Sequence, residues 1–154
     1  MQANRFQFSE GDPGARMRLR GQERRIENQH ERLDQLCREV YTTLGKDGPT
    51  AAINDFLLYK SAIEAHMTLE EEMFFPALHG LRADLSSVLT GLVKDHVEVR
   101  DELEEIKSSL KRRDGTAARI GLESLARLFE RHEKVEEDLI AHVSEGPITA
   151  QASS

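Results

Sequence analysis

The sequence predicts an all-α fold, an up-down-up-down antiparallel four-helix bundle. Three observations predict it: apolar residues recur at helical spacing in four long segments, breaks rich in glycine, aspartate and proline separate these segments, and the second half of the chain repeats the first. Short connections between long helices make consecutive helices antiparallel neighbours, so each half forms one helical hairpin.

Composition narrows the class of protein further. A chain of 154 residues with 38% hydrophobic and 32% charged residues is typical of one helical domain. The net charge of −7 argues against a nucleic-acid partner, because no basic surplus exists to neutralise phosphates. No apolar stretch reaches the ~20 residues that span a bilayer, so we expect no membrane association. A lone Cys37 cannot form an internal disulfide, which is compatible with the cytoplasmic location that we expect.

We expect a partly irregular N-terminal extension over residues 1–21, a bundle over 22–143 and a flexible tail over 144–154. The first helix begins near Gln22, because Gly14 and Gly21 weaken the helix before it, although Asp12-Pro13 has the form of a helix start. It ends at Leu44, and its apolar stripe is Ile26, Leu33, Leu36, Cys37 and Val40.

The break "GKDGPT" leads to a second helix, which Thr50 is expected to cap and which ends near Ala77. Pro76 lacks a backbone donor, so a stop or kink is expected there. After "HGLRADL", with Asp84 as the expected cap, a third helix runs to about Leu110. The break "KRRDGT" precedes a fourth helix over about 116–143. The third stripe is Val88, Leu92, Val99, Leu103 and Ile106, and the fourth includes Leu125, Phe129, Val135 and Leu139.

The two halves align without gaps at an offset of 66 residues, the separation of His30 from His96. The same offset places His66 on His132, and Glu70-Glu71 on Glu136-Glu137. Two hairpins that keep these polar residues in register suggest a pseudo-twofold axis and one shared central site.

Helix geometry brings the four histidines to one level of the bundle. At a rise of ~1.5 Å per residue, the climb from His30 to Leu44 and the descent from Thr50 to His66 are each about 21 to 24 Å. The same holds for His96 and His132, and all four belong to the apolar stripes of their helices. A single inward histidine is usually a hydrogen-bonded core residue, but four in one layer must satisfy one another or a cation.

Glutamates follow two of these histidines. Glu70 and Glu136, at i+4, share the face of His66 and His132 and lean back toward them. Residues at i+5 are rotated by about 140°, which leaves Glu71 as a neighbouring or substitute group and Glu137 as the alternative to Glu136. Glu72 is expected to face water.

Four imidazoles and two carboxylates suit two transition-metal ions, each held by about two nitrogens and bridged by both carboxylates. We expect a bridging oxide, hydroxide or water, because the carboxylates offset only part of the ions' charge. Nitrogen-rich donors favour iron, manganese or zinc over calcium or magnesium. The predicted ligands are His30, His66, Glu70, His96, His132 and Glu136, which leave coordination positions open for a small molecule.

The other polar residues are expected to lie in the core or at the surface rather than to bind metal. Tyr59 and Cys37 lie two turns from their histidines and are expected in the core, whereas His79 and His142 are expected at the surface. Arg100 and Asp34 occupy equivalent repeat positions. They would pair across the core, line an access route, or form an ordinary salt bridge or solvated rim.

These segments resemble hemerythrin-like proteins, the family of the HHE cation-binding domain. The resemblance rests on "NQHERL", "HMTLEEEMFFP", "KDHVEVRDEL" and "RHEKVEEDL" and covers residues 22–143. It implies a non-haem di-iron centre in a four-helix bundle that binds dioxygen or a related small ligand. Family members act as oxygen carriers, as sensors of oxygen, nitric oxide or iron, and in iron handling.

The chain departs from the oxygen-carrier pattern at two places. Arg100 stands where carriers place a further histidine, and glutamate occurs at both i+4 and i+5 after His132, where carriers typically use an aspartate at i+5. The resulting four-histidine, two-glutamate set is more symmetric, which argues against simple reversible oxygen carriage. We therefore favour a protein that binds or senses dioxygen, nitric oxide or peroxide.

Two alternatives stay open. One is an enzyme, a di-iron oxidase or peroxidase, or an iron-handling protein; the other is a bundle held by structural zinc or mixed metals. Ferritin-like sites are disfavoured because only Glu27-x-x-His30 matches their Glu-x-x-His spacing. No appended signalling domain is recognised, so a sensor is expected to act through a homodimer or a protein partner.

Overall fold

The computed structural model describes residues 13–152, with side chains at residue 14 and over 17–143. The described chain is helical and without strands, which confirms the predicted all-α class. Its elements are α1 (Pro13–Asp47), α2 (Pro49–Leu69), the π-helical segment η1 (Glu70–Phe74), α3 (Phe75–Leu81), the 3₁₀ turn η2 (Ala83–Leu85), α4 (Ser86–Lys111) and α5 (Gly115–Ala152).

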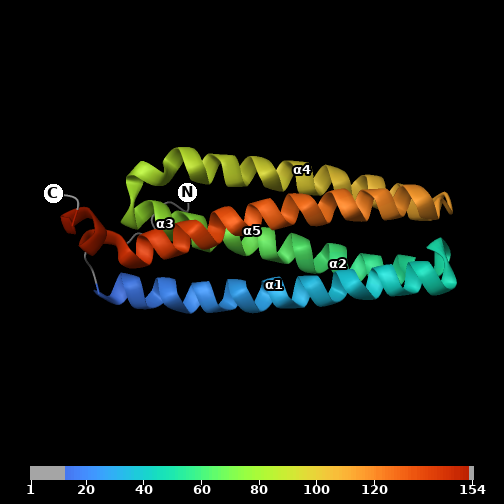
Figure 1. The fold of residues 1–154 in the computed structure, drawn as a ribbon, viewed down its shortest axis with the longest axis horizontal. Coiled ribbons are helices and arrows are strands. Elements are labelled where there is room, and N and C mark those ends of the chain that lie inside the picture. Colours follow the sequence, from blue (N-terminus) through green and yellow to red (C-terminus); the bar gives the residue numbers. More distant parts are fainter. Residues whose placement is uncertain (1–12, 153–154) are drawn as a thin grey trace.

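The helical rods of the bundle, formed by α1, by α2 with η1 and α3, by α4 and by α5, lie side by side along the long axis of the molecule (Figure 1). The α1–α2 and α4–α5 turns lie at one end, and the link from α3 to α4 lies at the other. The main packing partners are α1 with α2, α4 with α5, and α2 with α4, whereas α1 and α5 touch more sparingly. Each half of the chain is therefore one close hairpin.

The first and last helices, α1 and α5, are longer than the sequence pattern indicated. α1 begins at Pro13 rather than near Gln22, and α5 continues to Ala152 rather than ending near residue 143. Leu19 explains part of the first difference, because it is buried in the core and anchors the early turns despite Gly14 and Gly21. Tertiary burial outweighs the low helix propensity of glycine.

Two predicted helix caps are wrong. α2 begins at Pro49 after Gly48, whose φ of 89° suits glycine, so Thr50 already lies inside the helix. Asp84 lies in η2 and pairs with Arg82 at 2.7 Å instead of capping α4. α4 has no side-chain cap.

Pro76 does not end the helical segment that begins with α2. The helix instead widens into η1 just before the proline, and the amide of Phe75 donates to the carbonyl of Glu70, five residues back. α3 then continues to Leu81. A π-helical turn of this kind is rare and is found mainly at functional sites.

The core consists of two apolar clusters stacked along the bundle. One contains Ile63, Val99 and Phe129, and the other contains Phe74 and Leu92. Along each rod, the predicted polar residues fall between members of the two clusters. A buried polar layer thus separates two hydrophobic cores.

The apolar stripes were predicted correctly except at two valines. Val88 and Val135 are 41% and 38% exposed, and their neighbours Leu89 and Glu136 point inward instead. Both errors come from assigning a face near the end of a stripe or beside an inward glutamate. Within the described residues, no helix is long and apolar enough to cross a bilayer.

The larger apolar cluster should carry much of the folding free energy. Phe56 is fully buried in it, so Phe56→Ala should lower the free energy of unfolding by about 3–5 kcal/mol. Leu58, on the same helix, is 61% exposed, and Leu58→Ala should change it by less than about 0.5 kcal/mol. Urea denaturation measures both, and equal losses would contradict the assigned helix face.

Candidate metal centre

Six ionisable side chains meet in the polar layer. Each rod contributes to it: α1 gives one histidine, α2 with η1 a histidine and a glutamate, α4 one histidine, and α5 a histidine and a glutamate. Relative exposure is 8% for His30 and at most 1% for the other five. The six residues are His30, His66, Glu70, His96, His132 and Glu136.

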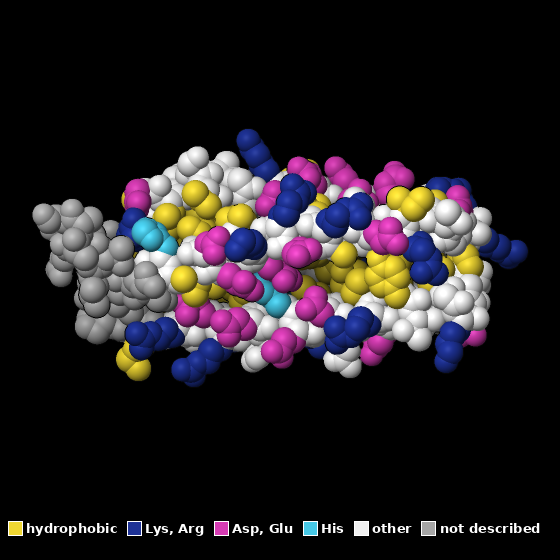
Figure 2. Space-filling model, viewed as in Figure 1, with side chains coloured by type: hydrophobic (Ala, Val, Ile, Leu, Met, Phe, Trp, Pro, Cys, Tyr) yellow, Lys and Arg dark blue, Asp and Glu magenta, His cyan; other side chains and the backbone are white. Residues whose placement is uncertain are grey.

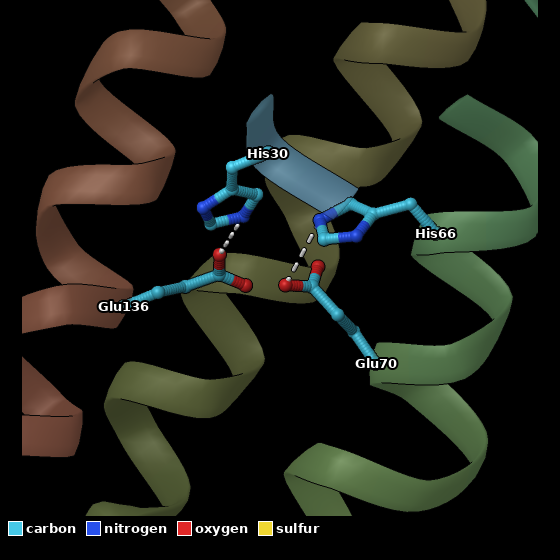
Figure 3. Close-up of side chains that lie close together, drawn as sticks. All are labelled: His30, His66, Glu70 and Glu136. Carbon is cyan, nitrogen blue, oxygen red and sulfur yellow. Dashed lines mark ion pairs between the residues drawn. The ribbon is translucent and has the colours of Figure 1, made fainter. Parts of the chain in front are cut away.

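One group within the layer contains His30, His66, Glu70 and Glu136, which point toward one another (Figure 3). His30 Nε2 lies 3.3 Å from Glu136 Oε1, and His66 Nε2 lies 3.2 Å from Glu70 Oε2. The two imidazole rings meet edge to face with centroids 4.9 Å apart. The sequence could place these residues on one level, but only the fold shows that their ring nitrogens and carboxylate oxygens converge.

A second group contains His96, His132 and Glu70. Glu70 Oε1 lies 2.9 Å from His96 Nε2 and 3.2 Å from His132 Nε2, and the two nitrogens are 3.3 Å apart. Glu136 Oε2 lies 3.1 Å from His132 Nε2. Both carboxylates therefore turn one oxygen toward each histidine pair.

The outer ring nitrogens have acceptors that fix the tautomers. His66 Nδ1 lies 2.7 Å from Gln29 Oε1. His96 Nδ1 lies 2.6 Å from a Glu71 oxygen, and His132 Nδ1 lies 3.1 Å from an Asp95 oxygen. Ionised carboxylates and amide oxygens only accept, so each Nδ1 must donate, and each neutral ring keeps a bare lone pair on Nε2.

Those inward lone pairs face acceptors only. Nε2 of His30 and His66, Oε2 of Glu70 and both oxygens of Glu136 are buried without a hydrogen-bond partner. Nitrogen lone pairs aimed at carboxylates repel unless protons or metal ions lie between them, and unpaired buried polar atoms are costly. Imidazole nitrogens held by outward hydrogen bonds to carboxylates are typical of metal ligands. The residues present therefore fit a metal centre.

Electrostatics within the layer favour an ionised Glu70. Burial by itself would raise the pKa of Glu70, but where protons rather than metal ions occupy the inward nitrogens, hydrogen bonds from His132, His66 and His96 outweigh burial and hold that pKa below its ordinary 4.5. Burial would lower the pKa of His132, but Glu70 and Asp95 raise it above 6.5. The layer attracts positive charge, whether protons or metal ions.

A family model for the hemerythrin HHE cation binding domain matches residues 23–142. The chain belongs to this family. No curated protein and no solved structure matched it in the corresponding comparisons. The matched range contains all six residues of the layer and the whole of both repeats, so membership agrees with the resemblance that the sequence motifs indicated.

In this hemerythrin-domain chain, the glutamates after each histidine divide by helix face. Glu70 and Glu136 are fully buried, whereas Glu72 and Glu137 are exposed. The structure thus places the i+4 residues, rather than Glu137, among the converging groups. Glu71 is half-buried at the edge of the layer, against His96.

The remaining polar residues lie away from the converging atoms. Arg100 forms a surface salt bridge with Glu71 at 3.0 Å, and Asp34 is exposed, so the two do not pair across the core. Tyr59 is buried in the larger cluster, and Cys37 is half-buried against it. His79 and His142 are exposed, as predicted.

Sequence reasoning missed Gln29 and Asp95. A signal was present: each precedes the histidine of its helix by one residue, and the repeat offset places one on the other. A residue beside an inward histidine can reach across to the neighbouring helix, which the pattern of one helix does not reveal.

Metal-free and metal-loaded protein should differ in the pH dependence of stability. Without metal, stabilisation through Glu70 is complete above its ordinary pKa of 4.5 and is lost as the pH falls through the lowered folded pKa. Stabilisation through His132 is complete below 6.5 and is lost as the pH rises through the raised folded pKa. Chelator-treated protein should therefore be most stable between pH 4.5 and 6.5.

Metal-loaded protein should instead gain stability over the pH range above 6.5, because protons compete with metal for the imidazoles. Thermal unfolding at a series of pH values, with and without chelator, measures both trends. The same trend in both forms would contradict a metal site built from these histidines.

Proposed function

We propose that the chain is a non-haem di-iron protein that binds or senses a small ligand such as dioxygen, nitric oxide or peroxide. The observation that carries this proposal is the ring of inward Nε2 and carboxylate atoms, in which acceptors outnumber donors while the imidazoles are neutral. Membership of the hemerythrin HHE family supports a cation site in these residues.

The two histidine pairs would each hold one ion. His30 and His66 form one pair and His96 and His132 the other, each with ring centroids 4.9 Å apart. Glu70 and Glu136 face both pairs and would bridge the ions. Two bound iron ions would supply open coordination positions and reversible electron exchange for the small ligand. Manganese and zinc suit the same donors.

The burial of the site sets the size of the ligand. His30, on α1, is the most accessible of the six residues, with 8% exposure, and α1 packs only sparingly against α5. Figure 2 shows a small area of histidine surface surrounded by acidic side chains midway along the molecule. We infer that a diatomic or similarly small molecule reaches the layer beside His30, and that larger substrates are excluded.

Among the described residues, no fifth histidine joins the layer, which argues against simple oxygen carriage. Arg100 is committed to Glu71 and points to the surface, so each pair has the same number of nitrogens. Sensing or redox chemistry with dioxygen or peroxide is compatible with such a centre. An oxidase, a peroxidase or an iron-handling protein is the enzyme alternative.

A structural zinc centre is the second alternative. Structural zinc sites are normally closed by four protein ligands, and two imidazole nitrogens with two bridging carboxylate oxygens would supply four donors to each ion. Absorption spectra that respond to a small ligand, rather than the donor count, separate the two functions.

Metal analysis of anaerobically purified protein, followed by absorption spectra on adding dioxygen, nitric oxide or peroxide, tests the proposal. About two iron ions per chain and a reversible ligand-dependent band are expected. Bleaching with multiple turnovers would indicate the enzyme alternative. Zinc alone, with no spectral response after reconstitution with iron, would contradict both.

The roles of neighbouring glutamates give a matched test. Glu70→Ala should abolish binding of both ions, because Glu70 belongs to both groups of converging atoms. Glu72→Ala, two residues later and exposed, should leave metal content and the unfolding midpoint unchanged. Metal content by inductively coupled plasma spectrometry measures the difference, and unchanged content in Glu70→Ala would remove Glu70 from the ligand set.

A further inference from the structure

We propose that the two metal positions are unequal, and that the His96–His132 position binds a divalent ion first and more tightly than the His30–His66 position. This inference rests on the proposed function. Its basis is the set of groups behind the imidazoles, which breaks the symmetry of the ligands themselves.

The clearest difference between the two halves lies in two hydrogen bonds at equivalent repeat positions. His66 Nδ1 donates to Gln29, and His132 Nδ1 donates to Asp95; both contacts span 37 residues. The offset of 66 residues maps Gln29 onto Asp95 and His66 onto His132. The geometry is therefore repeated, but a neutral amide in one half is replaced by a carboxylate in the other.

The other two histidines extend the difference in the same direction. His96 Nδ1 donates to Glu71 at 2.6 Å, whereas among the described side chains no acceptor is found for His30 Nδ1. Glu137, the repeat equivalent of Glu71, is exposed. Glu71 lies in the π-helical segment η1, and α5 is an uninterrupted α-helix at the corresponding place. The wider turn coincides with the contact that only one half makes.

An anionic acceptor on Nδ1–H makes the opposite nitrogen a stronger electron donor and adds negative charge near the bound cation. The His96–His132 pair has two such acceptors, and the His30–His66 pair has none. Arg100 offsets part of the negative charge of Glu71. The difference in charge behind the two histidine pairs therefore rests mainly on Asp95. Glu133 acts electrostatically on His30 and His66 but hydrogen-bonds to neither ring.

Stepwise titration of the metal-free protein with Zn²⁺ tests this inequality. Zn²⁺ is diamagnetic, so the imidazole nitrogen resonances of all four histidines can be followed by NMR. The first equivalent should shift His96 and His132, and the second should shift His30 and His66. Calorimetry should show two binding steps that differ by at least about tenfold in affinity.

A reciprocal pair of substitutions tests the cause. Asp95→Asn keeps the shape and removes the charge, and should weaken the first step about 10–100-fold while the second is unchanged. Gln29→Glu adds the charge behind His66 and should strengthen the second step. Asp101→Asn, at an exposed carboxylate on α4, is the matched control and should alter neither step.

The outcomes separate the two claims. Two equal steps, simultaneous shifts of all four histidines, or an unchanged first step in Asp95→Asn would overturn the inequality and leave the proposed dinuclear centre intact. Absence of metal binding in the wild-type chain would overturn the proposed function and this inference with it. The wild-type titration stands on its own, so it decides the order of filling even where a variant folds poorly.

Discussion

The structure depends on a buried layer in which imidazole nitrogens converge on carboxylate oxygens. Three of the four imidazoles present Nε2 lone pairs to two carboxylates, because Gln29, Glu71 and Asp95 accept the hydrogens of their Nδ1 atoms. Such a layer is unfavourable alone, since buried polar atoms need partners. Cations between the rings turn the same repulsion into attraction.

This layer also explains the division of the core. Apolar clusters lie on both sides of it, so hydrophobic burial at either end holds the helices together across the polar layer. The hydrophobic ends keep the donors close before a metal arrives. Binding energy at the centre then adds to the stability of the native bundle, because the unfolded chain has no preformed site.

Helix periodicity and the repeat predicted the fold and the inward groups well. The inward direction of His30, His96 and the i+4 glutamates follows from the helical period of 3.6 residues, applied separately to each helix. Contacts between helices were harder: Gln29 and Asp95 were missed because each lies at the edge of its own stripe and reaches a neighbour. Pro76 was expected to stop or kink the helix, yet the chain passes it through a π turn. The low helix propensity of Gly21 led to a predicted helix start that is too late, because the burial of Leu19 outweighs it.

The central claim is that two cations occupy the layer. Anomalous X-ray scattering from crystals of iron-loaded protein, measured on both sides of the iron absorption edge, tests it most directly. The account predicts two peaks per chain, one beside Nε2 of His30 and His66 and one beside Nε2 of His96 and His132. A layer without peaks, or iron bound only at surface carboxylates, would contradict it.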